Sequence, residues 1–262
     1  MRIEYIGHSG VLVELPNINL IFDCIAFDNV TVYNNKGSVH DVGKMPILDK
    51  AKETVFFASH VHGDHYVENI WDMRNKLDNV DYVISKDIPF SSGIRKHLGI
   101  DEAMESRITR VKNYTSQDIN LANGDTIHVQ TIPATDEGVA YLVKADGHII
   151  YHAGDHHLWM WEERGQEYMN NMDKVFRRTL SRLELEPGET IDLACLLLDG
   201  RLSPHTYDGM DAYLEMLPVK VVLPIHQWKE YRLTDEYIRD REGSLHGVTM
   251  LKVTGENCSF EI

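Results

Sequence analysis

The sequence predicts an α/β protein in which two β-sheets stack face to face and helices cover their outer faces. The first part of the chain consists mostly of short apolar runs separated by Gly, Pro-Asn, "NG" and "ADG" turns, which is typical of strands. The last third alternates strand-like and helix-like segments. Strand-rich halves that each carry helices favour stacked sheets, because both layers can then bury an apolar face.

The strands of the first part are predicted from apolar and β-branched runs. They span residues 2–6, 10–15, 19–23, 54–59, 80–85, 106–111, 125–132, 139–145 and 148–154. After the fourth of these, Val67, Ile70, Trp71 and Leu77 recur at helical spacing, which predicts a helix over 66–77. The residues between that strand and this helix therefore form a strand-to-helix loop.

The last third begins with a predicted amphipathic helix over 159–184, which contains no Pro and is rich in Met, Glu, Arg and Leu. Strands are then expected at 192–198, 220–226, 249–253 and 259–262, with helices at 207–217 and 233–241. No linker, short repeat or low-complexity segment divides the sequence. Residues 1–262 are therefore expected to form one domain.

The composition narrows the class of protein. The longest apolar runs are only strand-length and the N-terminal residues lack the apolar core of a signal peptide, which predicts a soluble, cytoplasmic protein without a membrane span. A formal net charge of -15 argues against nucleic acid as the substrate, because phosphate binding draws mainly on Lys and Arg. Cys24, Cys195 and Cys258 form no CxxC pair and are expected to be buried thiols rather than disulfides or metal ligands.

Three histidines and an aspartate follow the predicted strand at 54–59 within six residues: His60, His62, Asp64 and His65. Residues two apart on an extended segment project to the same side, so His60 and His62 can hold one ion together. The glycine turn that follows can carry Asp64 and His65 to a neighbouring position. The spacing therefore predicts two metal ions, in preference to a set of capping and loop hydrogen bonds.

Two later segments can return further ligands to the same place. Asp155 in "YHAGDHH" and His226 in "VLPIHQW" both follow a predicted strand, where rigid scaffolds usually present catalytic groups. A carboxylate at such a position can bridge two cations, because each of its oxygens can serve one of them.

These motifs, in this order, resemble those of the metallo-beta-lactamase superfamily, whose first motif is HxHxDH and whose later motifs supply a bridging Asp and a final His. The segments "YIGHSGVLVEL", "IFD", "ASHVHGDH", "YHAGD" and "PIHQW" are similar to the branch of metal-dependent hydrolases that includes ascorbate-6-phosphate lactonase-like proteins. The resemblance covers essentially the whole chain. It implies a four-layer αββα sandwich with a dinuclear, usually zinc, centre between the two sheets at one edge.

The resemblance also implies a ligand set. One ion would be held by His60, His62 and a third histidine, and the other by Asp64, His65 and His226, with Asp155 bridging. The third histidine of the family falls where this chain has "IPATDEGVAYLV", which contains none. Asp136 is the nearest residue with an anionic oxygen, and Thr135 and Glu137 are weaker candidates. Either Asp136 is a ligand, directly or through water, or this site is incomplete; a harder oxygen ligand would move preference toward Mn or Fe.

Four further residues are candidates near the predicted centre. His8 is similar to the family's "GHS" position and is expected to contact substrate or to support the ligands; the alternative is a turn histidine. Arg201 in "LDGRLSPH" can orient an anionic substrate as a bidentate donor, or can form a structural ion pair. His156 and His157 adjoin Asp155, and at most one of them should reach the metal cavity, because adjacent residues usually point apart.

The function implied is a metal-dependent hydrolase of a small anionic lactone, ester or phosphodiester. Two cations would acidify a water between them, Asp64 would orient that nucleophile and accept its proton, and Asp155 would fix the metal spacing. One alternative is a non-catalytic metal- or ligand-binding module derived from such a hydrolase. Cleavage of nucleic-acid phosphodiesters is a weaker alternative because of the acidic charge.

Loop 27–44 and the helix after His157 are expected to shape the pocket, and His40 and His246 to be surface or strand residues. The sequence makes no prediction of oligomeric state.

Overall fold

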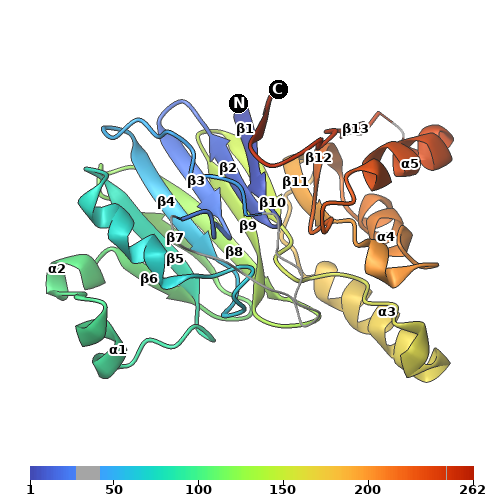
Figure 1. The fold of residues 1–262 in the computed structure, drawn as a ribbon, viewed down its shortest axis with the longest axis horizontal. Helices are drawn as coiled ribbons and strands as arrows, with labels where there is room; N and C mark the ends of the chain where they lie inside the picture. The colour runs from blue at the N-terminus through green and yellow to red at the C-terminus, as the bar shows by residue number, and fades with distance from the viewer. Residues whose placement is uncertain (28–41, 246) are drawn as a thin grey trace.

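The computed structural model describes residues 1–27, 42–245 and 247–262 of the 262-residue chain. Within these ranges the strands form two sheets of seven strands each, stacked against one another with helices on both outer sides (Figure 1). The predicted αββα order of layers is therefore confirmed. His40, His246 and most of loop 27–44 lie outside the described residues.

The first sheet is built mainly from the N-terminal part of the chain. In spatial order its strands are β14 (Cys258–Glu261), β1 (Arg2–Gly7), β2 (Gly10–Glu14), β3 (Ile18–Phe22), β4 (Glu53–Ala58), β5 (Val80–Ser85) and β6 (Ile108–Val111). The pairs from β14 to β3 are antiparallel, and those from β3 to β6 are parallel. Because β14 pairs with β1, the two termini lie side by side (Figure 1).

The second sheet contains the rest of the strands. In spatial order they are β13 (Thr249–Met250), β12 (Val219–Ile225), β11 (Ile191–Leu197), β10 (His148–His152), β9 (Val139–Ala145), β8 (Thr126–Pro133) and β7 (Ser116–Asn120). Strands β10 to β13 are parallel, and β7 to β10 form an antiparallel meander.

Helices cover the outer faces of the sheets. On the first sheet lie η1 (Glu68–Asn75), α1 (Ser92–His97) and α2 (Glu102–Glu105); on the second lie α3 (Gln166–Leu180), α4 (Asp208–Met216) and α5 (Arg232–Arg241), with short 3-10 turns η2 (Glu162–Arg164), η3 (Gly200–Leu202) and η4 (Glu242–Ser244) (Figure 1). Among the described helices, none is long and apolar enough to cross a membrane.

Alternation along the strands of the first sheet separates two apolar cores. In β2, Val11 and Val13 face the second sheet, whereas Leu12 belongs to the outer cluster under η1 and α2. In β3 and β4, Phe22 and Phe57 stack between the sheets with ring centroids 4.6 Å apart. Strands β1 to β5 of this sheet are therefore buried on both faces, which accounts for their nearly continuous apolar runs, whereas the edge strands β6 and β14 are only partly buried.

The helices depart from prediction in detail. The segment expected as a helix over 66–77 is a 3-10 helix, and the helix expected over 159–184 is confined to α3, because Gly165 at φ 84° separates it from η2. Strand β7 was not predicted, because its sequence "SQDIN" is polar and only Ile119 is buried. Cys24 and Cys195 are buried thiols as predicted, whereas Cys258 is only half-buried.

The arrangement of the parallel strands places the predicted ligands at one edge of the sandwich. Strands β3 and β4 are parallel in the first sheet, and β10, β11 and β12 are parallel in the second, so the carboxyl ends of each set share an edge. The loops that leave these ends carry most of the predicted ligands. At this edge the two sheets bring residues from widely separated parts of the sequence into contact.

Candidate metal centre

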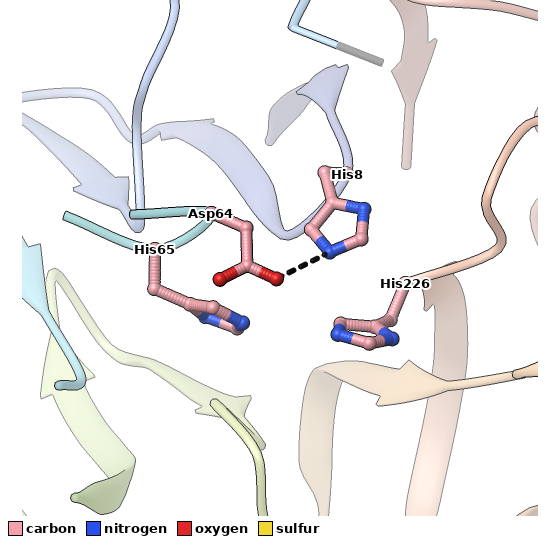
Figure 2. A group of neighbouring side chains, drawn as sticks. All are labelled: His8, Asp64, His65 and His226. Carbon is pink, nitrogen blue, oxygen red and sulfur yellow. Dashed lines mark ion pairs between the residues drawn. The ribbon is translucent and has the colours of Figure 1, made fainter. Parts of the chain in front are cut away.

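Two groups of side chains that are able to bind metal meet at this edge of the sandwich. The first contains His60, His62 and Asp155, and the second contains His8, Asp64, His65 and His226. Within each group, the atoms able to bind a metal all lie within 4.8 Å of one another. Figure 2 shows the second group, in which His8, Asp64 and His65 come from loops of the first sheet and His226 from a loop of the second. Six of the residues predicted as ligands are thus brought together.

Asp155 lies between the two groups and directs one oxygen toward each. Its Oδ1 is 3.1 Å from Nε2 of His65 and 3.6 Å from Nε2 of His226. Its Oδ2 is 3.6 Å from Nε2 of His60. A carboxylate in this position can bind two cations at once, because each oxygen faces a different set of imidazoles.

His65 and His60 are both oriented through their Nδ1 atoms. Nδ1 of His65 donates to Oδ2 of Asp23 over 2.7 Å, and the same Asp23 oxygen accepts the hydroxyl of Ser59 over 2.6 Å. That hydroxyl oxygen lies 2.9 Å from Nδ1 of His60. These contacts occupy the Nδ1 positions and leave Nε2 of each ring facing Asp155, as is usual for histidines that bind metal.

The other two histidines are held by carboxylates as well. Nδ1 of His226 lies 3.0 Å from Oδ2 of Asp199, which leaves Nε2 for the centre. Nε2 of His62 lies 2.8 Å from Oε2 of Glu137, which leaves Nδ1 directed toward Nε2 of His60 at 3.0 Å. All four histidines therefore have one ring nitrogen fixed by a partner and the other pointing into the cluster.

Buried polar atoms without hydrogen bonds indicate that the cluster suits a cation. Nε2 of His65 and Oδ1 of Asp155 are both inaccessible, and neither makes a hydrogen bond within the described residues. Such atoms are costly to bury unless a ligand satisfies them. The donor set of imidazoles and carboxylates suits zinc, and also accepts Mn or Fe.

The charged side chains of the cluster shift one another's pKa values. Burial raises the pKa of the Asp155 carboxyl, but the positive charge of His65, whose Nε2 is 3.1 Å away, outweighs it, and the net pKa lies well below its ordinary value. For Asp64, burial raises the pKa and the His8 imidazole, whose Nε2 is 3.4 Å from Oδ2, lowers it; the net pKa is below its ordinary value. Burial and the positive charge of His65 lower the pKa of His60 to about 4. The carboxylates are thus ionised and His60 is neutral at pH 7, the states that bind metal. Burial lowers the pKa of His65, but the charge of Asp155 outweighs it and the net pKa is raised, so a cation at this ring would displace its proton.

Two glycines allow the loops to come this close. A Cβ on Gly138, at φ 73°, would lie 2.2 Å from the carbonyl oxygen of Ser59 and 2.3 Å from Cβ of His60. A Cβ on Gly154, at φ 53°, would lie 2.7 Å from the carbonyl oxygen of Val139. Only glycine fits these positions, which place the β8–β9 turn and Asp155 against the histidine loop.

The residues proposed in place of the missing third histidine lie on the β8–β9 turn. Asp136 is near the cluster, since burial and then the charge of Asp155 raise its pKa, but it is not part of either metal-binding group. Glu137 contacts His62, and the Thr135 hydroxyl accepts from the amide of His157 over 2.8 Å. The turn therefore contacts the neighbouring loops through Thr135 and Glu137, and Asp136 lies outside both groups.

The remaining candidates, Arg201, His156 and His157, lie outside both groups. Arg201 donates through Nε and Nη2 to Asp199, and its guanidinium lies 4.3 Å from the ring centroid of Trp228, an arrangement that matches the structural ion pair. His156 is buried, with Nδ1 2.7 Å from the Tyr213 hydroxyl. His157 is also buried, packed against Gly209 of α4, and its ring nitrogens make no hydrogen bonds within the described residues.

Sequence reasoning missed the carboxylates that hold the histidines. Asp23 stands in the quoted "IFD" segment and Asp199 in "LDGRLSPH", but neither was assigned a role. Asp23 directly follows β3 and Asp199 lies two residues after β11, near the ends of strands of the parallel sets, as do Asp155 and His226. A carboxylate at each such strand end was the available signal.

No family model matches the sequence. Over 236 residues the chain is 24% identical to a UPF0173 metal-dependent hydrolase of Alkaliphilus metalliredigens, and the match covers 86% of this chain and 85% of the relative. Among solved structures, the metallo hydrolase Igni18 of Ignicoccus hospitalis has a TM-score of 0.57 at 16% identity, covering 100% of this chain and 98% of that one. The metallo-beta-lactamase fold protein YhfI of Bacillus subtilis has a TM-score of 0.53 at 13% identity, covering 99% of both chains.

Proposed function

We propose that this chain, which has the metallo-beta-lactamase fold, is a metal-dependent hydrolase of a small anionic lactone, ester or phosphodiester. The Alkaliphilus relative carries the name of a metal-dependent hydrolase, and the clustered donors supply the means to bind metal. The same quoted motifs favour the ascorbate-6-phosphate lactonase-like branch. Both sheets contribute donors, which supports treating residues 1–262 as one functional domain; we also propose that it acts in the cytoplasm.

The position of Asp155 is the observation that carries the proposal. Its Oδ1 faces His65 and His226, whereas its Oδ2 faces His60. Two separate groups that share one carboxylate match a centre for two divalent cations. We propose zinc for both, with Mn or Fe as the alternatives that a mixed imidazole and carboxylate site accepts.

The residues present can support hydrolysis. When bound, divalent cations lower the pKa of water toward neutrality and polarise the oxygen of a scissile bond. The Asp64 side chain is 21% exposed and ionised, so one of its oxygens can accept a proton from an attacking water. Asp155 is buried and fixed between the two groups. Its role is to hold their separation constant.

Access to the cluster is from the side of His62, whose side chain is 45% exposed, while His60, His65 and His226 are buried. A substrate would therefore approach the first group. The net charge of -15 supports a small substrate, since a nucleic acid would be repelled.

Metal content and turnover together test the proposal. The protein is purified without chelators, its Zn, Mn and Fe are measured by elemental analysis, and lactones, phosphodiesters and acyl esters are assayed with each metal. About two ions per chain and metal-dependent turnover are expected, with at least a hundredfold loss in His62→Ala. A protein that binds no metal would disprove the proposal, and metal without turnover would favour the binding-module alternative.

His128→Ala is a matched control for His62→Ala. His128 is a partly exposed histidine that also pairs with a carboxylate, Asp118, at 2.7 Å, but it lies on the β7–β8 hairpin. Activity of this variant should equal that of the unmodified protein. An equal loss in both variants would point to general instability rather than to the metal centre.

A further inference from the structure

We propose that His8 is itself a metal ligand, so that the second ion is held tightly by His8, Asp64, His65 and His226 while the first ion is held weakly and exchanges. This inference rests on the proposed function, because it concerns the same metal centre. It assigns His8 a different role from substrate contact, and it predicts which of the two ions meets the substrate.

The geometry places His8 inside the second group. Its Nε2 lies 3.4 Å from Oδ2 of Asp64, and its ring centroid is 4.2 Å from that of His226 (Figure 2). The His8 ring has no solvent-accessible surface. A buried imidazole whose Nε2 is this close to other donors, and that lies within the 4.8 Å limit of the group, is positioned to bind the same ion.

The backbone holds His8 in this position. The register of β1 and β2 shifts between Tyr5 and Gly7, and such a bulge re-aims the side chain that follows it. His8 then adopts φ 52°, in the left-handed region that non-glycine residues occupy only rarely. Its carbonyl oxygen accepts the amide of His226 over 2.9 Å, and His226 is itself at φ 61°. Two ligands from different sheets are thus tied together through their main chains.

The first group is poorer in ligands and more open. Among the described residues it offers His60, His62 and the shared Asp155. His62 is 45% exposed, and the nearest carboxylate, Glu137, is used to contact its Nε2. The second group offers four side chains besides Asp155, of which His8, His65 and His226 are buried.

This difference in ligands predicts the order in which the two sites fill with metal. More ligands on a rigid, buried frame bind a cation more tightly, so the second site should fill first and release its ion last. The first site keeps positions free of protein ligands, and an oxygen of the substrate can enter there. The ion in the first site is therefore the exchangeable one and the one that contacts the substrate.

Titration of metal-free protein with Zn²⁺, in competition with a chromophoric chelator, tests the order. The unmodified protein should bind two ions in steps whose dissociation constants differ at least tenfold. His8→Asn should weaken the tight step at least tenfold and leave the weak step; Asn is chosen because it accepts the left-handed backbone conformation. His62→Ala should remove the weak step and leave the tight one.

A spectroscopic measurement separates a ligand from a merely structural residue. With one equivalent of Co²⁺, the visible absorption of the bound ion should change in His8→Asn and remain unchanged in His62→Ala. If His8→Asn retains both binding steps and the Co²⁺ spectrum, the assignment of His8 is wrong although the centre stands. If the unmodified protein binds no ion, the proposed function fails instead. Circular dichroism of each variant verifies that it is folded.

Discussion

Nδ1 of His65 lies 2.7 Å from Oδ2 of Asp23, and both side chains are inaccessible to solvent. Burial raises the pKa of the Asp23 carboxyl, but the hydrogen bond and charge of His65 lower it by more. The net pKa is below its ordinary value, so the carboxylate is ionised. Asp23 follows β3 and His65 follows β4, two parallel neighbours, which is why the carboxylate reaches the ring. The pair fixes which nitrogen of His65 faces the second group.

Asp23→Asn should lower metal affinity by about 10- to 100-fold, because an amide is a weaker acceptor and no longer holds the imidazole tautomer that binds metal. The fold should be retained, since Asn has the same shape. Chelator competition with Zn²⁺ measures the affinity. Asp118→Asn is the matched control: it alters another Asp–His pair, with His128 on the β7–β8 hairpin, and should leave affinity unchanged. Equal affinities of Asp23→Asn and the unmodified protein would contradict the assigned role.

Gly138→Ala should damage the first group and the stability of the protein together. The new methyl would lie 2.2 Å from the Ser59 carbonyl oxygen, so the β8–β9 turn must move away from His60. We expect a loss of about 3 kcal/mol or more in the free energy of unfolding, measured by urea denaturation.

Gly147→Ala separates the clash from backbone strain. Gly147 has a similar φ of 77°, but a Cβ there would meet no atom within 4 Å. This variant should lose only about 1 to 2 kcal/mol, the cost of the left-handed conformation, and should bind metal normally. If the two variants are equally stable, the close approach at Gly138 is not what constrains the turn.

Glu53→Gln should change how stability depends on pH. Glu53 and Asp81 are buried on adjacent strands, and their side chains accept the amides of Asn123 and Ala122 over 3.0 and 2.9 Å. Burial, and next the hydrogen bond and charge of Asp81, raise the pKa of Glu53 from 4.5 to about 7. Between pH 4.5 and pH 7, the folded protein therefore keeps a proton on Glu53 that the unfolded chain has lost. The stability that this proton contributes is fully present below pH 4.5 and is lost as pH rises through 7.

Gln stays neutral at every pH, so the variant should lack this decline. Between pH 5 and pH 8, the free energy of unfolding should fall by about 1 to 2 kcal/mol less in Glu53→Gln than in the unmodified protein. Urea denaturation at both pH values measures the difference. Parallel pH dependence in the two proteins would show that Glu53 is already ionised at pH 5.

The features that the sequence predicts well are those with a strong local pattern. Strands buried on both faces give continuous apolar runs, so β2, β4 and β11 are recognisable without knowledge of their neighbours. Strand β7 is an edge strand with one buried residue, and its polar sequence gives no such pattern. The start of α3 after Gly165 depends on one backbone conformation, which the helical periodicity of the segment does not reveal.

The centre is predictable only in part, for a similar reason. Four of the donors lie within six residues and are recognisable from their spacing: His60, His62, Asp64 and His65. The contacts that hold them come from Asp23, which is 42 residues from His65, and Asp199, which is 27 residues from His226. The place of His8 in the second group depends on a bulge and a left-handed residue, and neither leaves a periodic signal.

The donors of the second group range from His8, in the turn after the first strand, to His226, after the twelfth. During synthesis on the ribosome, a chain that has emerged only as far as its middle carries the HxHxDH segment but neither Asp155 nor His226. The proposed high-affinity site would therefore form only when most of the chain has been made and both sheets have docked. Metal uptake would then be a late event in the life of the molecule, and it would report that assembly is complete.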